Sequence, residues 1–165
     1  MKSTIVLLGL ACGVATWVPA LAAEEARLPG ADARIKAQLD ALDYEYEVDE
    51  DDDYKMVFKV GDSERSQVVY VRSVVESYGE HHVREIWSFG HVSPTEQFSP
   101  ALANRLLEAS GIAKLGGWVK QGKNAVFVVK LAADASQELL DDALTAALVM
   151  ADEMEAELTP GQDDL

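Results

Sequence analysis

The spacing of apolar residues changes several times along the chain, and each change marks the border of a predicted element. A first helix is predicted over residues 33–42, where Ile35, Leu39 and Leu42 follow helical steps. Asp32 stands just before this helix and can cap its N-terminus. Beyond the helix the apolar period becomes two, which is the pattern of β-strands.

Two short alternating runs flank an acidic cluster with six carboxylates between Glu47 and Asp53. If Val48 faces Tyr54, then Glu47 faces Lys55, so that apolar residues meet on one side and opposite charges on the other. A shift by one residue would put charges on the apolar side. The sequence therefore predicts an antiparallel hairpin with residues 49–53 as its loop.

The pattern of strands continues at residues 66–75 and 83–89, separated by a predicted loop at 76–82. The first of these strands is apolar on both sides, which is typical of a central strand covered above and below. A second helix should begin at Pro100, with Ser99 as its N-cap, and end before Gly111. Its predicted buried side chains are Leu102, Leu106 and Leu107, with Ala103 and Ala109 nearby.

A second hairpin is predicted with Gly122 and Lys123 as its turn, which sets Trp118 opposite Phe127. The last helix, capped by Asp134 or Ser136, should end near Leu158 because Thr-Pro-Gly follows. The order α-β-β-β(-β)-α-β-β-α predicts an α+β fold, in which helices pack on an antiparallel sheet as a two-layer sandwich. One domain is expected over residues 32–159, followed by an acidic tail at 160–165.

The first 22 residues combine Lys2 with an uncharged apolar run that ends in small residues, which is typical of a signal peptide. Cleavage is expected after Ala22 or Ala23, with residues 23–31 as a linker. Cys12 also admits a weaker reading as a lipid-attachment site. Export predicts a periplasmic or secreted protein that has no membrane segment after cleavage, and whose mature chain has no cysteine for disulfides or thiolate chemistry.

The chain has 14 basic and 29 acidic residues, a formal net charge of −15. Such a charge repels phosphate backbones and anionic lipids, so we expect neither nucleic acid nor a membrane surface as partner. Solubility explains the charge in the simplest way. The alternative is a protein that stays monodisperse while it presents an apolar patch to a partner.

The acidic cluster has two interpretations, a hairpin tip and a cation site. A calcium loop of the EF-hand type needs Gly at its sixth position and Glu at its twelfth, and counting from Asp49 these positions hold Tyr54 and Val60. Short acidic residues suit turns by themselves, so the hairpin tip is favoured. A cation-responsive or hydrolytic role for residues 49–53 remains the alternative.

The remaining candidates for chemistry are few. His81, His82 and His91 are interpreted as polar loop residues and not as metal ligands. Adjacent side chains of a strand point to opposite faces, so His81 and His82 cannot easily bind one ion together. We find no G-x-S-x-G elbow and no phosphate-binding glycine motif. Acidic residues are so abundant that no acid–base pair can be singled out. We therefore predict no catalytic residue, no cofactor and no metal ligand.

Two tryptophans and two glycines form the predicted partner-binding set: Trp87, Gly116, Gly117 and Trp118. Large aromatics usually anchor a core. The alternative is a patch that faces a partner, with the glycines letting another backbone approach a strand edge.

Five segments resemble the YbjN-domain proteins, which are catalogued as bacterial sensory transduction regulators: YEYEVDEDDDYKMVFKV, RSQVVYVRS, REIWS, ALANRLLEASGIAKLGGW and AVFVVKLAADAS. The resemblance covers about Ile35 to Leu158. It implies a fold like that of type III secretion chaperones, often dimeric, and no enzymatic activity. Secretion chaperones work in the cytosol, whereas this chain carries a predicted leader. We therefore expect an exported, non-enzymatic module, a homodimer, that binds an unknown protein or peptide through a sheet edge or a groove beside a helix.

Overall fold

The computed structural model describes residues 30–61 and 65–160. The predicted signal peptide with Cys12, most of the linker and the tail beyond Pro160 lie outside these residues. Nine elements follow one another: α1 (Ala33–Ala41), β1 (Glu47–Val48), β2 (Tyr54–Lys59), β3 (Ser66–Tyr78), β4 (His81–Val92), α2 (Pro100–Ile112), β5 (Gly117–Gln121), β6 (Asn124–Ala132) and α3 (Gln137–Leu158).

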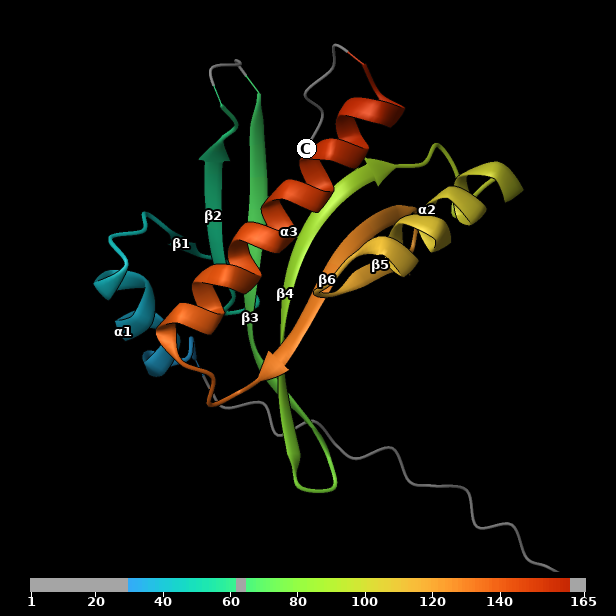
Figure 1. Ribbon diagram of the computed structural model, residues 1–165. Helices are drawn as coiled ribbons and strands as arrows, with labels where there is room; N and C mark the ends of the chain where they lie inside the picture. The colour runs from blue at the N-terminus through green and yellow to red at the C-terminus, as the bar shows by residue number, and fades with distance from the viewer. Residues whose placement is uncertain (1–29, 62–64, 161–165) are drawn as a thin grey trace, which may run out of the picture.

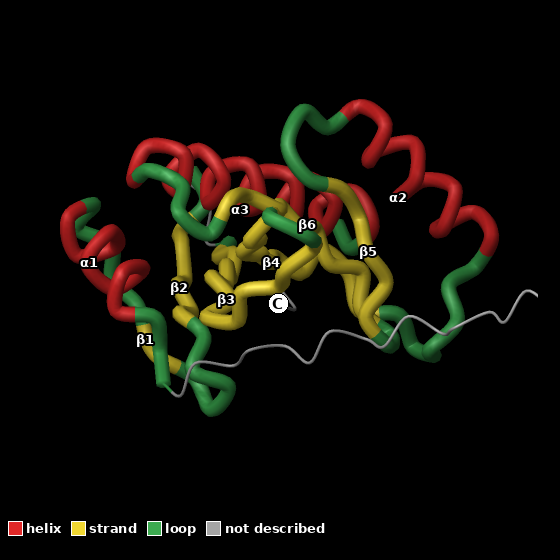
Figure 2. The backbone as a smooth tube through the Cα atoms, turned by 90° about the horizontal axis from the view of Figure 1, so that it is seen from below, coloured by secondary structure: helices red, strands yellow, loops and turns green. Residues whose placement is uncertain are grey.

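The six strands form one antiparallel sheet in the order β1-β2-β3-β4-β6-β5. The long helix α3 crosses the middle of this sheet over β3, β4 and β6, as Figure 1 shows. Helix α1 lies near one edge and α2 near the other, on the same side as α3 (Figure 2). The prediction of an α+β fold in two layers is confirmed.

The register predicted for the first hairpin is also confirmed, since Val48 pairs with Tyr54 and Glu47 with Lys55. The ladder is shorter than the alternation suggested, because β1 has only two residues. Tyr44 leaves the ladder but still packs edge-to-face against Phe58, with the ring centres 5.5 Å apart. The rings of Tyr44 and Phe58 thus stay in contact beyond the last backbone pair of the hairpin.

The predicted loop at residues 76–82 is wrong. Strands β3 and β4 run on to Tyr78 and His81, joined by a tight turn in which Gly79 adopts a φ of +60°. This long hairpin projects beyond the rest of the sheet in Figure 1. Glycine tolerates such a backbone at no steric cost, so the strands can continue to the turn.

The helix caps agree with the sequence: the side chains of Asp32, Ser99 and Ser136 accept hydrogen bonds from the first turns of α1, α2 and α3. Two details of α2 differ. The helix includes Gly111, and Leu107, which was predicted to be buried, is 68% exposed. Helix α2 lies at the edge of the sheet, where it packs against β5 and the end of α3, so a narrower stripe of its side chains is covered.

The main core lies between the sheet and the helices. Its largest buried apolar side chains are Tyr54, Phe127, Leu39, Met56, Ile86, Leu140 and Leu144. The opposite face of the sheet carries no helix among the described residues (Figure 2). The prediction that strand 66–75 is covered on both sides is therefore wrong. Its second apolar side, with Val68 and Tyr70, lies on this uncovered face.

Candidate functional site

The two tryptophans of the predicted partner-binding set lie on opposite faces of the sheet. Trp118 pairs with Phe127, whose ring is part of the core, and thus points toward the helices. Trp87 pairs with Val128 and points to the uncovered face. Neighbouring residues of a strand face opposite sides, and Phe127 and Val128 are neighbours. The structure therefore does not bring the two indole rings into one patch.

The two glycines stand at the start of β5 and serve the packing of their own chain. A Cβ on Gly116 would lie 2.5 Å from the carbonyl oxygen of Val128 and 2.9 Å from the ring of Phe127. The φ of Gly116 is +76°, which side chains rarely adopt. The close approach predicted for a partner's backbone is made here by strand β6. Gly117 adjoins Ser110 of α2 instead.

A groove runs between helix α2 and the edge strand β5, beside Trp118. Its volume is about 600 Å³. The lining residues are Glu96, Gln97 and Phe98 from the loop before α2, Ala103, Leu106 and Leu107 from α2, and Trp118, Val119 and Lys120 from β5. We call this the α2–β5 groove. Most of its walls are apolar, and Leu107 remains 68% exposed. Val119 borders the groove through β5, but its side chain points to the opposite face from Trp118.

Trp118 is the fixed wall of this groove. Its ring packs edge-to-face on Phe127 with the centres 5.4 Å apart, and it leaves no room for a Cβ on Gly90. The backbone N–H of Trp118 donates to the Ser110 hydroxyl of α2, 2.8 Å away. The indole N–H of Trp118 has no hydrogen-bond partner among the described residues. The groove thus has a rigid aromatic wall on the strand and an exposed leucine on the helix.

The uncovered face around Trp87 is held together by charges that neutralise each other. Arg72 lies over the Trp87 ring, 4.3 Å from its centre, and also forms an ion pair with Asp53. Glu85 accepts a hydrogen bond from the Trp87 indole N–H at 2.7 Å and pairs with Lys130 at 2.8 Å. A hollow of about 320 Å³ lies among these residues. Arg72, Glu85 and Lys130 at this hollow therefore already have partners.

Two carboxylates of the acidic hairpin, those of Asp49 and Asp53, are held by bonds within the protein. Asp49 accepts hydrogen bonds from the N–H groups of Asp51 and Asp53, both at 2.9 Å. Asp53 is buried, pairs with Arg72 and accepts the N–H of Ser73 at 2.7 Å. Burial raises the pKa of Asp53, which these interactions only partly offset. Within residues 30–61 and 65–160, no three His, Cys, Asp or Glu side chains converge as a metal site.

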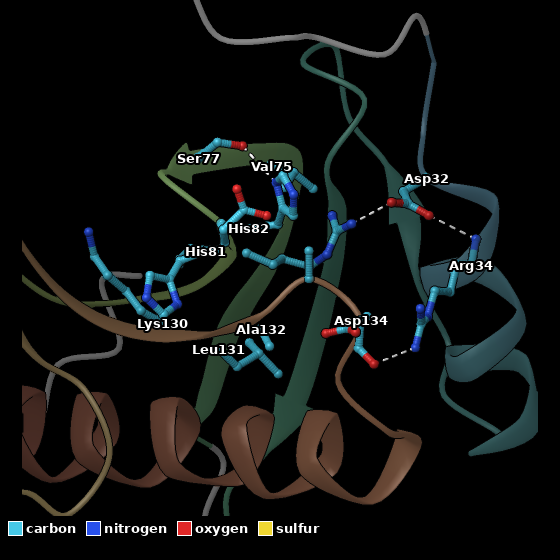
Figure 3. A pocket seen from close by; sticks show the side chains of 14 residues that line it. Asp32, Arg34, Val75, Ser77, His81, His82, Lys130, Leu131, Ala132 and Asp134 are labelled. Carbon is cyan, nitrogen blue, oxygen red and sulfur yellow. Dashed lines mark hydrogen bonds and ion pairs between the residues drawn. The ribbon is translucent and has the colours of Figure 1, made fainter. Parts of the chain in front are cut away.

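A cavity of about 820 Å³ lies at the end of the sheet where the β3–β4 hairpin projects (Figure 3). Asp32 and Arg34 from the start of α1 line one side, while Ser77 and His82 from the hairpin line another. Arg84, which is 2% exposed, pairs with Asp32 at its border.

Burial alone would raise the pKa of Asp32, but the Arg34 backbone N–H and the charge of Arg84 outweigh it and hold the pKa below its ordinary value. The Asp32 carboxylate is therefore ionised at neutral pH. Through Arg84, this carboxylate joins the start of α1 to β3, because Arg84 also donates to the carbonyls of Arg72 and Ser73. These two carbonyls lie in a bulge of β3, where the pairing with β4 shifts between Val71 and Val75.

The same cavity holds the single pairing of a serine with a histidine that the described part of the chain shows. Ser77 Oγ lies 2.8 Å from His82 Nδ1, across the β3–β4 hairpin. A hydrolytic serine also needs a group that orients the far nitrogen of the histidine. No described carboxylate bonds to His82, and both residues are exposed. Ser77 and His82 thus form a cross-strand contact near the tip of the β3–β4 hairpin.

The three histidines do not lie in loops as predicted, because all three belong to β4. His81 and His82 are exposed, while His91 is half-buried. Burial lowers the pKa of His91, so its neutral form is favoured.

Several residues that shape these sites were not singled out by sequence reasoning. Arg84 occupies a position of β4 at which the alternating pattern predicts a buried apolar residue. A charged residue at such a position indicates a buried ion pair, and this signal was present in the sequence. Leu107 was assigned to the core because its helical spacing fits, although it borders the groove. Asp53 was read as a turn residue and is a buried ion-pair partner.

No family model matches the chain, and no curated protein matches it. Among the described residues, no helix is long and apolar enough to cross a membrane. The fold and the groove describe this protein as a two-layer α+β domain with an apolar groove at one edge of its sheet.

Proposed function

We propose that this protein is an exported, non-enzymatic module of the bacterial envelope that binds a segment of a partner protein in the α2–β5 groove. The observation that carries the proposal is the apolar groove of about 600 Å³, which the 68% exposed Leu107 of α2 and the half-buried Trp118 of β5 both line. Grooves of this kind are recurrent sites of peptide recognition, because an apolar side chain of the partner loses water there.

The rigidity of the strand side supports this assignment. The ring of Trp118 packs on Phe127 and fills the space beside Gly90, and its backbone N–H is bonded to Ser110. A preformed wall lowers the entropic cost of binding, and tryptophans are frequent centres of binding energy in interfaces. Of the predicted partner-binding residues, Trp118 therefore lies at the proposed site. Trp87 lies on the other face.

The leader pattern at residues 1–22 supports the proposed export, and the order of the elements is compatible with the resemblance to YbjN-domain proteins. Expression of the full chain in a Gram-negative host tests the location. The mature protein is expected in the periplasmic fraction, with a mass that corresponds to cleavage after Ala22 or Ala23. The homodimer favoured by the resemblance stays a prediction, which light scattering of the purified mature protein tests.

Binding is tested by panning a random peptide library against the purified mature protein. Wild type should enrich peptides that share apolar residues and compete with one another. Leu107→Asp places a charge in the groove and should abolish the enrichment. Leu107 is exposed, so this change should leave the melting temperature nearly unaltered.

The matched control is Val57→Asp, which alters another exposed apolar residue, 61% exposed, on strand β2. This variant should enrich the same peptides as wild type. The proposal would be abandoned if no peptides were enriched. It would equally be abandoned if the two aspartate variants behaved alike.

A further inference from the structure

We propose that the partner segment binds in extended form as an added strand along β5, and that it is acidic with apolar residues at alternate positions. This inference rests on the proposed binding function of the α2–β5 groove. It adds the backbone conformation and the charge of the partner.

The backbone of β5 supplies the first argument. In the sheet order β5 is an edge, with β6 on one side only. The N–H of Trp118 points away from β6, because it donates to Ser110. Hydrogen-bonding direction alternates along a strand, so the N–H and C=O of Lys120 point outward as well. A strand laid beside β5 can pair with the N–H and C=O of Lys120, while the N–H of Trp118 stays bonded to Ser110.

The position of the groove supplies the second argument. Side chains of an added strand alternate between the two faces of the sheet. On the face toward α2 they would enter the space between Leu107 and Trp118. On the other face they would continue the row of Val119. An apolar residue at every second position therefore fits the groove, while the intervening positions remain free for polar residues.

The charge around β5 supplies the third argument. Between Glu108 and Asp134 the chain contains four lysines and no acidic residue, although the whole chain has a net charge of −15. Lys130 pairs with Glu85. Lys114, Lys120 and Lys123 have no carboxylate within salt-bridge distance among the described residues.

The three unpaired lysines lie before, within and after β5. Lys114 precedes the strand, Lys120 belongs to it and lines the groove, and Lys123 lies in the turn that follows. Carboxylates along an added strand would meet these ammonium groups. Complementary charges of this kind select the partner more than they increase affinity.

The experiment uses peptides from the library panning and measures their affinity by the fluorescence of Trp118. Trp17 lies in the predicted leader, so Trp87→Phe leaves Trp118 as the sole tryptophan of the mature chain. Selected peptides should contain Asp or Glu between alternating apolar residues. Two methylated forms of each peptide are compared, one with methyl groups on the odd-numbered backbone nitrogens and one with methyl groups on the even-numbered ones. One form should bind about tenfold or more weakly and the other nearly as well as the unmodified peptide, because only alternate N–H groups face β5.

The charge argument is tested by the double variant Lys120→Glu with Lys123→Glu. It should weaken the acidic peptides about tenfold. The matched control is Lys59→Glu, since Lys59 is also exposed and without a salt-bridge partner in the described chain, but lies on β2. This control should bind the peptides as wild type does.

The outcomes separate the two proposals. Peptides that bind as helices, or that bind well in both methylated forms, would overturn strand addition while the groove keeps its function. Basic peptides, or unchanged binding by the double variant, would overturn the acidic partner. Failure of every peptide to bind would remove the proposed function together with this inference.

Discussion

Arg84 is the residue whose replacement should reveal most about how the domain is held together. Its guanidinium is almost completely buried, pairs with Asp32 and donates to the carbonyls of Arg72 at 2.6 Å and Ser73 at 3.1 Å. These contacts join the start of α1 to the bulge in β3. Arg84→Met keeps much of the side-chain volume and removes the charge and the donors.

The expected cost follows from the groups left behind. Loss of one partner from a buried ion pair typically destabilises a protein by about 3 to 5 kcal/mol, because the other charge stays without compensation. The Asp32 carboxylate is partly exposed, with 16% of its side chain accessible, and it keeps the capping bond from the Arg34 N–H at 2.8 Å. The lower end, about 3 kcal/mol, is therefore expected, equivalent to a fall in melting temperature of about 10 °C.

Urea unfolding followed by circular dichroism measures this loss. The control is Arg105→Met, which removes an exposed ion pair to Glu157 and should cost under about 1 kcal/mol. Adding Asp32→Asn to Arg84→Met should recover part of the loss, since the stranded charge is then gone. A loss below about 1 kcal/mol for Arg84→Met, with an unchanged dependence on urea, would refute the reasoning.

Three further predictions concern the backbone, the pH dependence and the acidic loop. Gly116→Ala should cost about 2 kcal/mol or more in urea unfolding, against about 1 kcal/mol for Gly122→Ala, where a Cβ meets nothing within 4 Å. Because burial lowers the pKa of His91, the unfolded chain takes up that proton first, so the unfolding free energy should fall as pH drops from about 6.5 toward the folded value. His91→Gln should flatten this slope in melts at several pH values, and the exposed His81→Gln should not. Millimolar calcium should leave the melting temperature unchanged, because Asp49 already accepts backbone N–H groups of the loop and Asp53 already pairs with an arginine; a clear rise would restore the cation site.

Much of the architecture could be predicted from local patterns. The register of the first hairpin follows from two faces that must agree, and the pairing of Trp118 with Phe127 follows from the turn at Gly122. Each of the caps at Asp32, Ser99 and Ser136 depends on one side chain that can accept a hydrogen bond at the start of a helix. These features depend on neighbours in the sequence, so the sequence itself contains the information.

The site was predicted only in part, because its features depend on which face of the sheet a side chain meets. The sequence marks Trp87 and Trp118 as similar candidates, and only the pairing with Val128 and Phe127 separates them. Leu107 has the spacing of a core residue, yet α2 lies at the sheet edge and leaves it exposed.

By itself, the sequence determined the helix starts, the strand pairing within the β1–β2 and β5–β6 hairpins and the acidic loop, since each of these is set by alternation or capping over a few residues. The tertiary structure decided the order of the strands in the sheet, the length of the β3–β4 hairpin, the side that the helices cover and the partners of Arg84 and Asp53. These depend on contacts between segments far apart in the chain, and no local period encodes which distant surface a side chain will meet.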